Sequence, residues 1–366
     1  MNILHVMDGY DCGGVETQAY EIIKSLSIQN RNFLININVN QRKIFNRFKK
    51  LQNNKRLVQI FELVYKFDFQ LIFLIYFFLL NNKMDAIIIY PCHKKMLFVA
   101  LAAKIAGVNK VFISMQNVLI EKRYLKIFKI KFFYGFLEML KINFVPASKS
   151  ILNSVLNFNI SLSKYKIIKN SCDIEGINKE VKKYKNLINS KRVKNIVMLA
   201  RLDEIKDQVT LLQAYSNLNF KSWDLKIYGD GPYLNQLKKV ALSLSLDPDK
   251  IFCGFTDDVP KVLSETDIFA FSTTEYEGFG KVLIEAMAAD IPIIASDVSA
   301  CREVLMNGEA GLLIPPKDIN LWETSLKRLM ESESERVKLS KKSKKYKKYY
   351  DSKKIALEWE ELININ

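Results

Sequence analysis

Residues 268–288 read IFAFSTTEYEGFGKVLIEAMA, a pattern typical of one unit of a parallel α/β fold. The apolar run Ile268–Phe271 predicts a buried strand, and the residues after Gly280 have the spacing of a helix. Between them, Gly278 and Gly280 permit a turn whose backbone N–H groups can approach a ligand closely. The N–H groups and the dipole of a helix start suit an anion. The stretch therefore predicts a phosphate-binding turn, although a plain structural turn would have the same pattern.

Strand and helix patterns alternate along the rest of the chain in the same way. Strands that alternate with helices favour a parallel sheet with helices on both faces. Two such series follow each other, so the fold class is α/β and resembles two Rossmann-like domains facing across a cleft. The predicted strands are 2–7, 34–39, 86–90, 110–114 and 143–147 in the first series and 195–199, 224–228, 251–253, 268–271, 293–295 and 311–314 in the second.

A length of 366 residues suits two domains better than one core. We expect a first domain over 1–172, a polar and basic linker over 173–194 with room for one surface helix, and a second domain over 195–344. The tail is charged but carries Trp359, and a tryptophan is rarely left in water. We therefore expect the last helix, about 345–366, to pack, with the first domain as its candidate partner.

The net charge of +16 lies entirely in the first domain. Residues 1–172 hold 25 Lys and Arg against 9 Asp and Glu, and the remaining residues hold 30 of each kind. The first domain therefore predicts an anionic partner: nucleic acid, acidic lipid or a phosphate-bearing substrate. With 49% hydrophobic residues the composition is globular, which excludes the disordered and collagen-like classes.

Cysteine and histidine are too few and too scattered for a metal centre or a disulfide frame. The five cysteines form no CxxC cluster, and the chain has two histidines. Asp247 and Asp249 spell DxD, but they lie in a predicted loop away from the other motifs and indicate a turn. No secretory signal opens the sequence, and the apolar run Leu71–Leu80 is about half the length of a membrane-spanning helix. We therefore expect a cytoplasmic protein that binds no metal and at most lies on a membrane.

Three further loops carry polar or glycine-rich sequences at predicted strand ends. Arg201 and Lys206 could together hold a diphosphate without a metal, and ordinary surface ion pairs are the alternative. YGDGPY at 228–233 and DCGGVE at 11–16 are predicted turns before helices, and the second could contact one phosphate. A carboxylate inside a helix, such as Glu285, could accept hydrogen bonds from ribose hydroxyls.

Together these blocks resemble the retaining glycosyltransferases of family 4, of the bacterial surface-polysaccharide type and the GT-B fold. EGFGKVLIEAMA at 277–288 is similar to the Glu-x7-Glu signature of that family. The resemblance covers nearly the whole chain in the expected order: GGVE at 13–16, KNSCD at 169–173, ARLDEIKD at 200–207, YGDGP at 228–232, CGF at 253–255 and GLLIPPKD at 311–318.

The resemblance implies a hexosyltransferase-type enzyme that moves a sugar from a nucleoside diphosphate sugar, with a UDP-sugar favoured, to a saccharide or lipid-linked acceptor. Transfer would retain the anomeric configuration, need no metal or other cofactor, and serve cell-surface polysaccharide or lipopolysaccharide synthesis. Glu277, Arg201 and Lys206 would be the catalytic residues. The residues implied in donor binding are Gly14, Arg201, Lys206, Gly254, Phe255, Glu277, Gly278, Phe279, Gly280, Lys281 and Glu285.

Within that set, the two cations would neutralise the diphosphate as charge grows on it. Glu285 would bind the ribose hydroxyls, while Glu277 and the backbone of 279–281 would hold the donor sugar. Gly254 and Phe255 would line the base pocket, and Gly14 would close over the phosphates from the first domain.

Two positions depart from the family pattern. Where the family often carries a histidine near the donor sugar, this chain has Gln116, whose amide can hydrogen-bond a donor-sugar or acceptor hydroxyl but cannot exchange protons near neutral pH. His93 does not match that register and is interpreted as a polar loop residue, with a place in the cleft as the alternative. The usual Asn-Gly-Ile-Asp is NSCD at 170–173, which puts a tight glycine turn there in doubt.

We assign the acceptor and a membrane contact to the basic first domain. The stretch 121–140, most of which lies in the predicted helix 125–141, has an apolar strip beside a basic one: Leu125, Phe128, Phe132 and Phe136 against Lys122, Lys126 and Lys129. This arrangement suits the headgroup region of an acidic membrane, and a core helix with solvated lysines is the alternative. We expect a protein that is cytoplasmic and peripheral on the inner face of the cytoplasmic membrane.

Other functions explain fewer of these features. A nucleic-acid-binding protein would explain the charge, but no aromatic-basic RNA motif or recognition helix is apparent. The paired cations and glutamates argue against an epimerase-like enzyme, and a phosphorylase would need a recognisable pyridoxal-phosphate lysine. A non-catalytic sensor of sugar nucleotides is an alternative that the motifs alone do not exclude.

Overall fold

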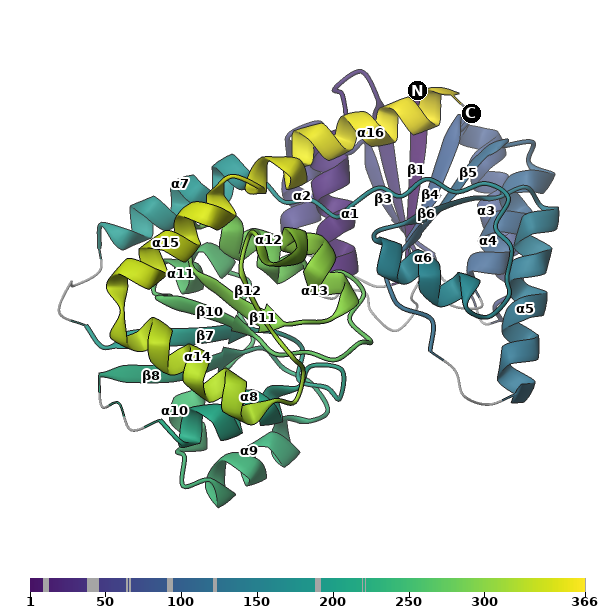
Figure 1. Ribbon diagram of the computed structural model, residues 1–366. Coiled ribbons are helices and arrows are strands. Elements are labelled where there is room, and N and C mark those ends of the chain that lie inside the picture. Colours follow the sequence, from purple (N-terminus) through teal and green to yellow (C-terminus); the bar gives the residue numbers. More distant parts are fainter. Residues whose placement is uncertain are drawn as a thin grey trace. The chain divides into compact units, whose positions relative to one another are not determined.

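The computed structural model describes residues 1–8, 13–37, 46–63, 65, 67–90, 95–120, 124–187, 192–218, 220 and 222–365. The chain divides into two compact units, a first unit of Met1–Ser171 with Ser352–Asn366 and a second unit of Cys172–Asp351 (Figure 1). It therefore passes from one unit to the other twice. A parallel bridge between Cys172 and Asp351 pairs the two passages within the second unit.

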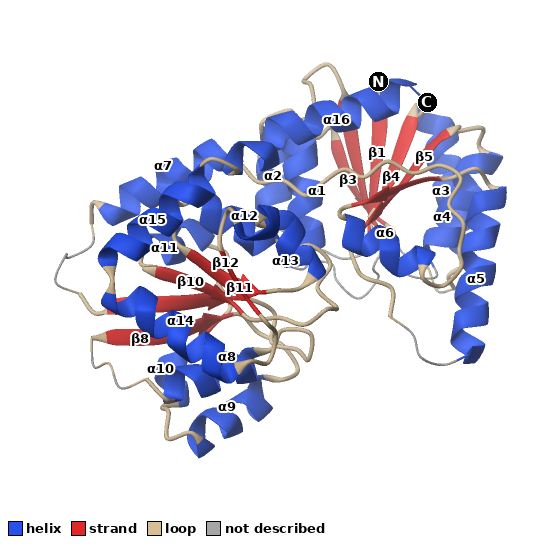
Figure 2. Cartoon of the chain, viewed as in Figure 1, coloured by secondary structure: helices blue, strands red, loops and turns tan. Residues whose placement is uncertain are grey.

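The first unit is built on a parallel sheet of six strands in the order β3-β2-β1-β4-β5-β6, flanked by helices (Figure 2). Because helices cover the sheet, strands such as β1 and β4 are buried and consist mainly of apolar residues. The strands are β1 (Asn2–Met7), β2 (Arg31–Asn36), β3 (Gln59–Glu62), β4 (Ala86–Ile89), β5 (Lys110–Met115) and β6 (Asn143–Pro146). The helices are α1 (Gly14–Ser25), α2 (Asn46–Asn53), α3 (Gln70–Asn82), α4 (Lys95–Ile105), α5 (Tyr124–Met139), α6 (Lys149–Leu156) and α16 (Ser352–Ile365).

The second unit has its own parallel sheet, in the order β12-β11-β10-β7-β8-β9. The strands are β7 (Lys194–Leu199), β8 (Trp223–Tyr228), β9 (Phe252–Gly254), β10 (Ile268–Phe271), β11 (Ile293–Ser296) and β12 (Leu312–Ile314). The helices are α7 (Ile174–Lys185), α8 (Gln208–Ser216), α9 (Leu234–Ser243), α10 (Pro248–Ile251), α11 (Val259–Ser264), α12 (Lys281–Ala288), α13 (Ser299–Val304), η1 (Met306–Gly308), α14 (Ile319–Glu331), α15 (Glu333–Lys344) and η2 (Lys347–Tyr350).

Both sheets have the strand order of a Rossmann fold, in which the first and fourth strands of the unit are neighbours. From these two strands the chain continues toward opposite edges of the sheet, and ligands of such folds bind at the carboxyl ends of this strand pair. The pair is β1 and β4 in the first unit and β7 and β10 in the second. The predicted fold class, α/β with two Rossmann-like domains, is confirmed.

The range 173–194, predicted as a linker with room for one surface helix, holds the helix α7, and this helix belongs to the second unit. Ile174 and Val181 are buried on this helix, and Asn178 Nδ2 donates a hydrogen bond to Ala288 O of α12 at 3.0 Å. A few apolar side chains on one helical face are enough to dock α7. The prediction, which followed the basic composition of this segment, therefore set the start of the second domain too late, at residue 195, whereas the second unit begins at Cys172.

The last helix, α16, packs within the first unit. Trp359 is buried, and its ring meets the ring of Phe112 edge-on with 6.4 Å between the centroids. Lys110 Nζ at the start of β5 donates a hydrogen bond to Ile363 O at 2.8 Å. The tail therefore completes the hydrophobic core of the unit in which the sequence begins.

Candidate functional site

Strands β7 and β10 lie side by side in the second sheet, and the loops that follow them carry most of the predicted donor site. These loops are residues 200–207 and 272–280. One backbone oxygen helps to join them, because Ile205 O accepts from Thr274 N and from Thr273 Oγ1, each at 3.0 Å. The order of the strands therefore brings together residues that are far apart in the sequence.

Lys206 and Glu277 form an ion pair across these loops, although 71 positions separate them. Lys206 Nζ donates to Glu277 Oε2, and the same oxygen accepts from Thr273 Oγ1 at 3.3 Å. The ammonium also lies over the ring of Phe271, 5.2 Å from its centroid. Both charged side chains are largely removed from water, so each is the main electrostatic partner of the other. Two of the three predicted catalytic residues are therefore in direct contact.

The turn before α12 holds the second oxygen of Glu277. Glu277 Oε1 accepts from the backbone N–H groups of Gly278, Phe279 and Gly280 at 3.1, 3.4 and 3.2 Å. From the sequence we expect these N–H groups to face the donor, but in this structure they serve Glu277. The turn that leads into α12 does bind an anion, and that anion is the protein's own carboxylate.

The carboxyl of Glu277 is held in its ionised form. Burial alone would raise its pKa, but the Lys206 ammonium and the hydrogen bonds from Lys206, the Phe279 N–H and Thr273 outweigh burial and lower the pKa below its ordinary value. A carboxylate with a lowered pKa is a weak base near neutral pH. Such a carboxylate can accept hydrogen bonds but is poorly suited to take a proton.

Gly280 is required where the turn enters α12. Its φ of 79° lies in the left-handed region, which residues other than glycine rarely adopt. A β-carbon at this position would also lie 3.1 Å from Leu283 Cδ1. The second glycine of the motif therefore follows from the backbone geometry of the turn.

The YGDGP segment after β8 packs its backbone against the loop that carries Arg201. A β-carbon on Gly229 would lie 1.9 Å from Ala200 O, and one on Gly231 would lie 2.2 Å from Leu202 O. Both glycines therefore allow the two loops to touch. The segment therefore shapes the loop 200–207. This agrees with the interpretation of YGDGP as a structural turn.

The other predicted donor residues of the second unit lie at the end of β9, on the loops that follow β7 and β9, and on α12. Gly254 ends β9, and Phe255 follows it and is about half exposed. Glu285 is buried on α12. Arg201 is largely exposed, with its Nε 3.6 Å from Asp203 Oδ2. Such an exposed pair is weak, so the guanidinium can turn toward a ligand at small cost.

Two predicted contacts belong to the first unit. Gly14 is the first residue of α1, and no atom of the described residues would lie within 4 Å of a β-carbon there. Gln116 follows β5 and is buried, and its Nε2 donates to Ser114 Oγ at 2.8 Å. His93, together with residues 11 and 12 of the DCGGVE motif, lies outside the described residues.

Sequence reasoning missed an ion pair at the ends of β1 and β4. Lys95 Nζ, at the start of α4, lies 3.2 Å from Oδ1 of Asp8, which follows β1. Burial would lower the pKa of Lys95, but a hydrogen bond with Tyr65 and the Asp8 carboxylate outweigh burial and raise it. The signal that could have found the pair is its place beside the first and fourth strands of the unit.

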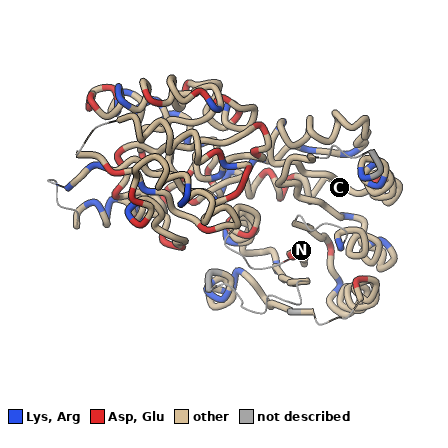
Figure 3. The backbone as a smooth tube through the Cα atoms, turned by 90° about the horizontal axis from the view of Figure 1, so that it is seen from below, with Lys and Arg blue, Asp and Glu red and all other residues tan. Residues whose placement is uncertain are grey.

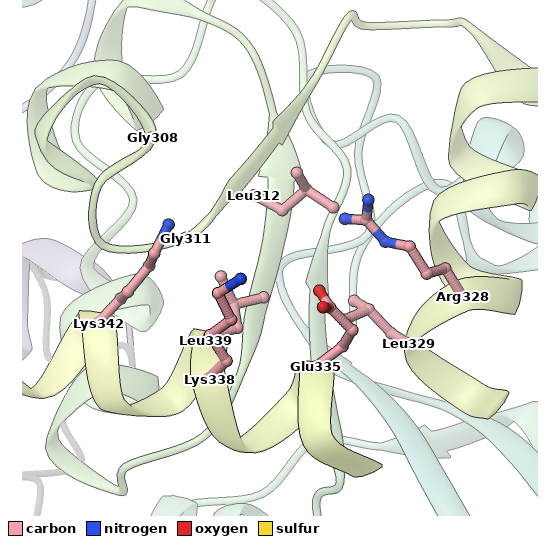
Figure 4. A pocket seen from close by; sticks show the side chains of 9 residues that line it. All are labelled: Gly308, Gly311, Leu312, Arg328, Leu329, Glu335, Lys338, Leu339 and Lys342. Carbon is pink, nitrogen blue, oxygen red and sulfur yellow. The ribbon is translucent and has the colours of Figure 1, made fainter. Parts of the chain in front are cut away.

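A pocket of about 130 Å³ lies elsewhere in the second unit, between α14, α15 and the segment that leads into β12 (Figure 4). Arg328, Lys338, Lys342 and Glu335 make its wall polar, and none of the predicted donor residues lines it. Within the ranges that the structure describes, no three His, Cys, Asp or Glu side chains gather as a metal site would require. None of the described helices has the length and apolar content to cross a bilayer.

Comparison with known proteins gives the family of the second unit and relatives along part of the chain. Residues 177–346 match the family described as Glycosyl transferases group 1. The N-acetylgalactosamine-N,N'-diacetylbacillosaminyl-diphospho-undecaprenol 4-alpha-N-acetylgalactosaminyltransferase of Campylobacter jejuni is 32% identical over 216 residues, which are 58% of this chain and 57% of the relative. The capsular polysaccharide biosynthesis glycosyltransferase CapM of Staphylococcus aureus is 27% identical over 188 residues, 50% of this chain and 48% of the relative. This chain spans about half the length of these curated relatives.

Solved structures share the fold along nearly the whole chain. HepE of Anabaena, in complex with UDP and glucose, matches with a TM-score of 0.82 at 18% identity and covers 100% of this chain and 99% of its own. WaaG, a glycosyltransferase involved in lipopolysaccharide biosynthesis, matches with a TM-score of 0.73 at 11% identity and covers 99% of each chain. The segment that matches the family includes Arg201, Lys206 and Glu277. Residues 177–346 are therefore similar to the group 1 glycosyltransferases, and the chain shares the fold of the solved structures.

Proposed function

We propose that this chain transfers a sugar from a nucleoside diphosphate sugar, specifically a UDP-sugar, to a saccharide or lipid-linked acceptor, with retention and without a metal ion. The reaction serves cell-surface polysaccharide or lipopolysaccharide synthesis in the cytoplasm, at the inner face of the cytoplasmic membrane. The observation that carries the proposal is the buried pair of Lys206 and Glu277 at the carboxyl ends of β7 and β10. The named activities of the bacterial relatives and the UDP bound to HepE support the choice of acceptor pathway and base.

The chemistry needs positive charge where the leaving group departs. When the bond between the anomeric carbon and the diphosphate oxygen breaks, its electron pair stays on the diphosphate. Lys206 and Arg201 follow β7, and their hydrogen bonds and charge would stabilise that oxygen. In a transfer with retention, the acceptor oxygen bonds to the face that the leaving group vacates. The departing phosphate oxygen is then placed to take the acceptor's proton.

Glu277 would orient the donor sugar, and binding would rearrange its contacts. The carboxylate already accepts from three backbone N–H groups, from Lys206 and from Thr273, and two oxygens offer about four acceptor positions. A sugar hydroxyl must therefore replace one partner. Lys206 is the partner that a donor draws away, because a diphosphate offers the ammonium more negative charge than one carboxylate does.

The remaining assignments follow the order of the strands. Glu285 on α12 would accept from the ribose hydroxyls, and Gly254 and Phe255 at the end of β9 would contact the base. In the first unit, Gly14 would approach the phosphates with its backbone. Gln116 would donate to, or accept from, a donor-sugar or acceptor hydroxyl.

The partner proposed for the first unit is an acidic membrane surface. Phe128 and Phe132 of α5 are 68% and 69% exposed, which is not the environment of a core helix. Lys126, Lys129 and Lys131 on the same helix are exposed as well. In Figure 3 the unit that holds both chain termini carries basic segments and few acidic ones. Aromatic rings flanked by cations suit the headgroup region of anionic lipid.

Helix α3 adds a second apolar surface to the same unit. None of its 13 residues is charged. Leu71, Ile75 and Leu79 are buried, whereas Phe73 and Phe77 on the opposite side are 59% and 57% exposed. A helix that is apolar all round needs an apolar environment on its outer side too. Helices α3 and α5 both contact α4, and we call their four exposed rings, Phe73, Phe77, Phe128 and Phe132, the aromatic face.

The proposed function is tested by offering the purified protein UDP-, GDP- and TDP-sugars, with hydrolysis and thermal stabilisation as the two measurements. We expect one nucleoside diphosphate to raise the melting temperature and its sugar to be hydrolysed slowly, with no change when a chelator is added. Lys206→Met should lose both effects. A protein that no nucleotide stabilises would contradict the proposal, and chelator-sensitive turnover would remove its metal-free part.

A further inference from the structure

Lys281, the first residue of α12, has an unusual environment for a cation. Its side chain is 8% exposed, and no hydrogen-bond acceptor within the described part of the chain reaches its Nζ. Buried polar groups almost always have a partner, and an unpaired buried ammonium is among the least favourable groups in a protein. Its place is also unfavourable, because the positive end of a helix dipole repels a cation. Lys281 therefore destabilises the empty protein in two ways.

The neighbouring positive groups do have partners. Lys206 is paired with Glu277, and Arg201 Nε lies 3.6 Å from Asp203 Oδ2. The N–H groups of the turn at 278–280 are also taken up by Glu277. Among the described groups around this turn, the charge of Lys281 is the one left without a counterpart.

We propose that the side chain of Lys281 binds the diphosphate of the nucleotide donor, a role that rests on the proposed function. Lys281 directly follows Gly280, at the turn between β10 and α12 that joins the loop of Arg201 and Lys206 through the pair of Lys206 and Glu277. A diphosphate there satisfies the ammonium and the helix dipole together. Sequence reasoning assigned only the backbone of this residue to the donor. The side chain adds a third cation to Arg201 and Lys206, and it is the one that needs no carboxylate to be displaced.

If Lys281 has this role, its charge lowers the stability of the protein without a donor and raises the affinity for the donor. Removing the charge should therefore stabilise the ligand-free protein and weaken donor binding. Substitution of a residue that serves packing alone would not raise stability while lowering affinity. Ligand binding to the folded form then recovers the stability that the lysine costs.

The test compares Lys281→Met, Lys281→Arg and Lys327→Met, with UDP and GDP as probes in calorimetric titration and thermal melting. Lys281→Met should raise the melting temperature of the empty protein and weaken binding of the nucleotide by about tenfold. Lys281→Arg keeps the charge and should bind almost as well as the original chain. Lys327 is exposed on α14, so Lys327→Met is the matched loss of one positive charge and should change neither quantity.

Three results would overturn the inference. Equal nucleotide affinity of Lys281→Met and the original chain would show that the ammonium does not contact the diphosphate. A lower melting temperature of empty Lys281→Met would show that the lysine already has a stabilising partner. Weakened binding of UDP-glucuronate with unchanged binding of UDP and UDP-glucose would assign the ammonium to a sugar carboxylate. If the original chain binds neither UDP nor GDP, the proposed function fails first and the inference with it.

Discussion

Lys206 Nζ donates to Glu277 Oε2 at the point where two neighbouring strands of the second sheet end, and the other carboxylate oxygen is fixed by three backbone N–H groups. The pair is almost entirely out of water. A buried charge is tolerated there because the opposite charge lies beside it. Removing one of the two side chains leaves the other charge buried and unpaired, and its desolvation then lowers the stability of the fold. The stability of the second unit and its proposed chemistry therefore depend on the same two side chains.

Lys206→Met should lower the free energy of unfolding by about 3 kcal/mol, because it leaves the Glu277 carboxylate buried without its counter-charge. The double variant Lys206→Met/Glu277→Gln should recover part of that loss, since no charge then remains unpaired. Urea denaturation measures both. Arg302→Ala is the control, because it breaks an exposed ion pair with Asp297 and should cost less than about 1 kcal/mol. Equal losses in the buried and exposed pairs would contradict this account.

The pH dependence of stability should report the same pair. The pKa of Glu277 is lowered in the folded protein, chiefly by Lys206 against the opposing effect of burial. Ionised Glu277 therefore contributes its full stabilisation above the ordinary carboxyl pKa of about 4.3. This stabilisation is lost as the pH falls through the lower pKa that Glu277 has in the folded protein. Between about pH 5 and about pH 3, the original chain should lose stability more steeply than Glu277→Gln. Parallel curves for the two proteins would refute the assignment.

His5 in the first unit should behave as a neutral imidazole far below its usual range. Burial lowers its pKa to about 4, against a hydrogen bond with Asn32 that raises it. Asn32 Oδ1 can only accept, so Nε2 of His5 carries the proton, and Nδ1 accepts from Tyr90 O–H at 3.0 Å. Stability should be lost as the pH falls from about 6.5 to about 4, by about 3 kcal/mol.

The chain has two histidines, so proton NMR of the imidazoles separates His5 from His93, and His93→Gln assigns the signals. We expect one resonance to titrate near pH 4. A His5 resonance that titrates near its ordinary value of about 6.5 would mean that water reaches the ring.

Alanine substitution at three glycines should lower stability by amounts that follow the backbone geometry at each position. Gly280→Ala should cost about 1–2 kcal/mol, because it forces a β-carbon into the left-handed region. Gly229→Ala should cost more, since its β-carbon would lie 1.9 Å from a backbone oxygen. Gly14→Ala should leave folding unchanged, because the described residues leave room there. The melting temperatures of the three variants give the order of stability. A Gly14→Ala protein as unstable as Gly229→Ala would contradict the expected order.

The sequence predicts the buried strands well because a parallel sheet covered on both faces needs continuous apolar runs. Ile268–Phe271 is observed as β10 with the predicted bounds. The strand β3 (Gln59–Glu62) was not predicted, because a short edge strand with one neighbour needs fewer apolar residues. The segment of α7 was assigned to a linker and not to the second domain, because its basic residues outnumber the two that it buries.

The residues of the candidate site could be named from motifs, but their contacts could not. That Lys206 meets Glu277 depends on β7 and β10 being neighbours, which the strand order decides and local sequence does not. That Glu277 takes the N–H groups of its own turn depends on a side-chain rotamer. The burial of Lys281 likewise depends on the packing around α12, because lysine is usually exposed.

The aromatic face should bind anionic membranes through its exposed rings. Phe73→Glu/Phe77→Glu on α3 should weaken binding to phosphatidylglycerol-containing vesicles by tenfold or more, because each ring that enters the interface contributes on the order of 1.5–3 kcal/mol. Phe128→Glu/Phe132→Glu on α5 should act in the same direction. Vesicle flotation at low and high salt measures both variants. High salt should weaken the contribution of the lysines and leave that of the rings.

Leu242→Glu is the matched control, because Leu242 is 64% exposed on α9 of the second unit. It should leave vesicle binding unchanged while adding the same charge. Light scattering on the same samples tests the competing occupant, a second copy of this chain. If the α3 variant converts a dimer to a monomer and still floats with vesicles, the aromatic face joins two copies and does not bind lipid. If neutral and anionic vesicles bind the original chain equally, the lysines of α5 have no part in the interaction and the acidic partner is wrong.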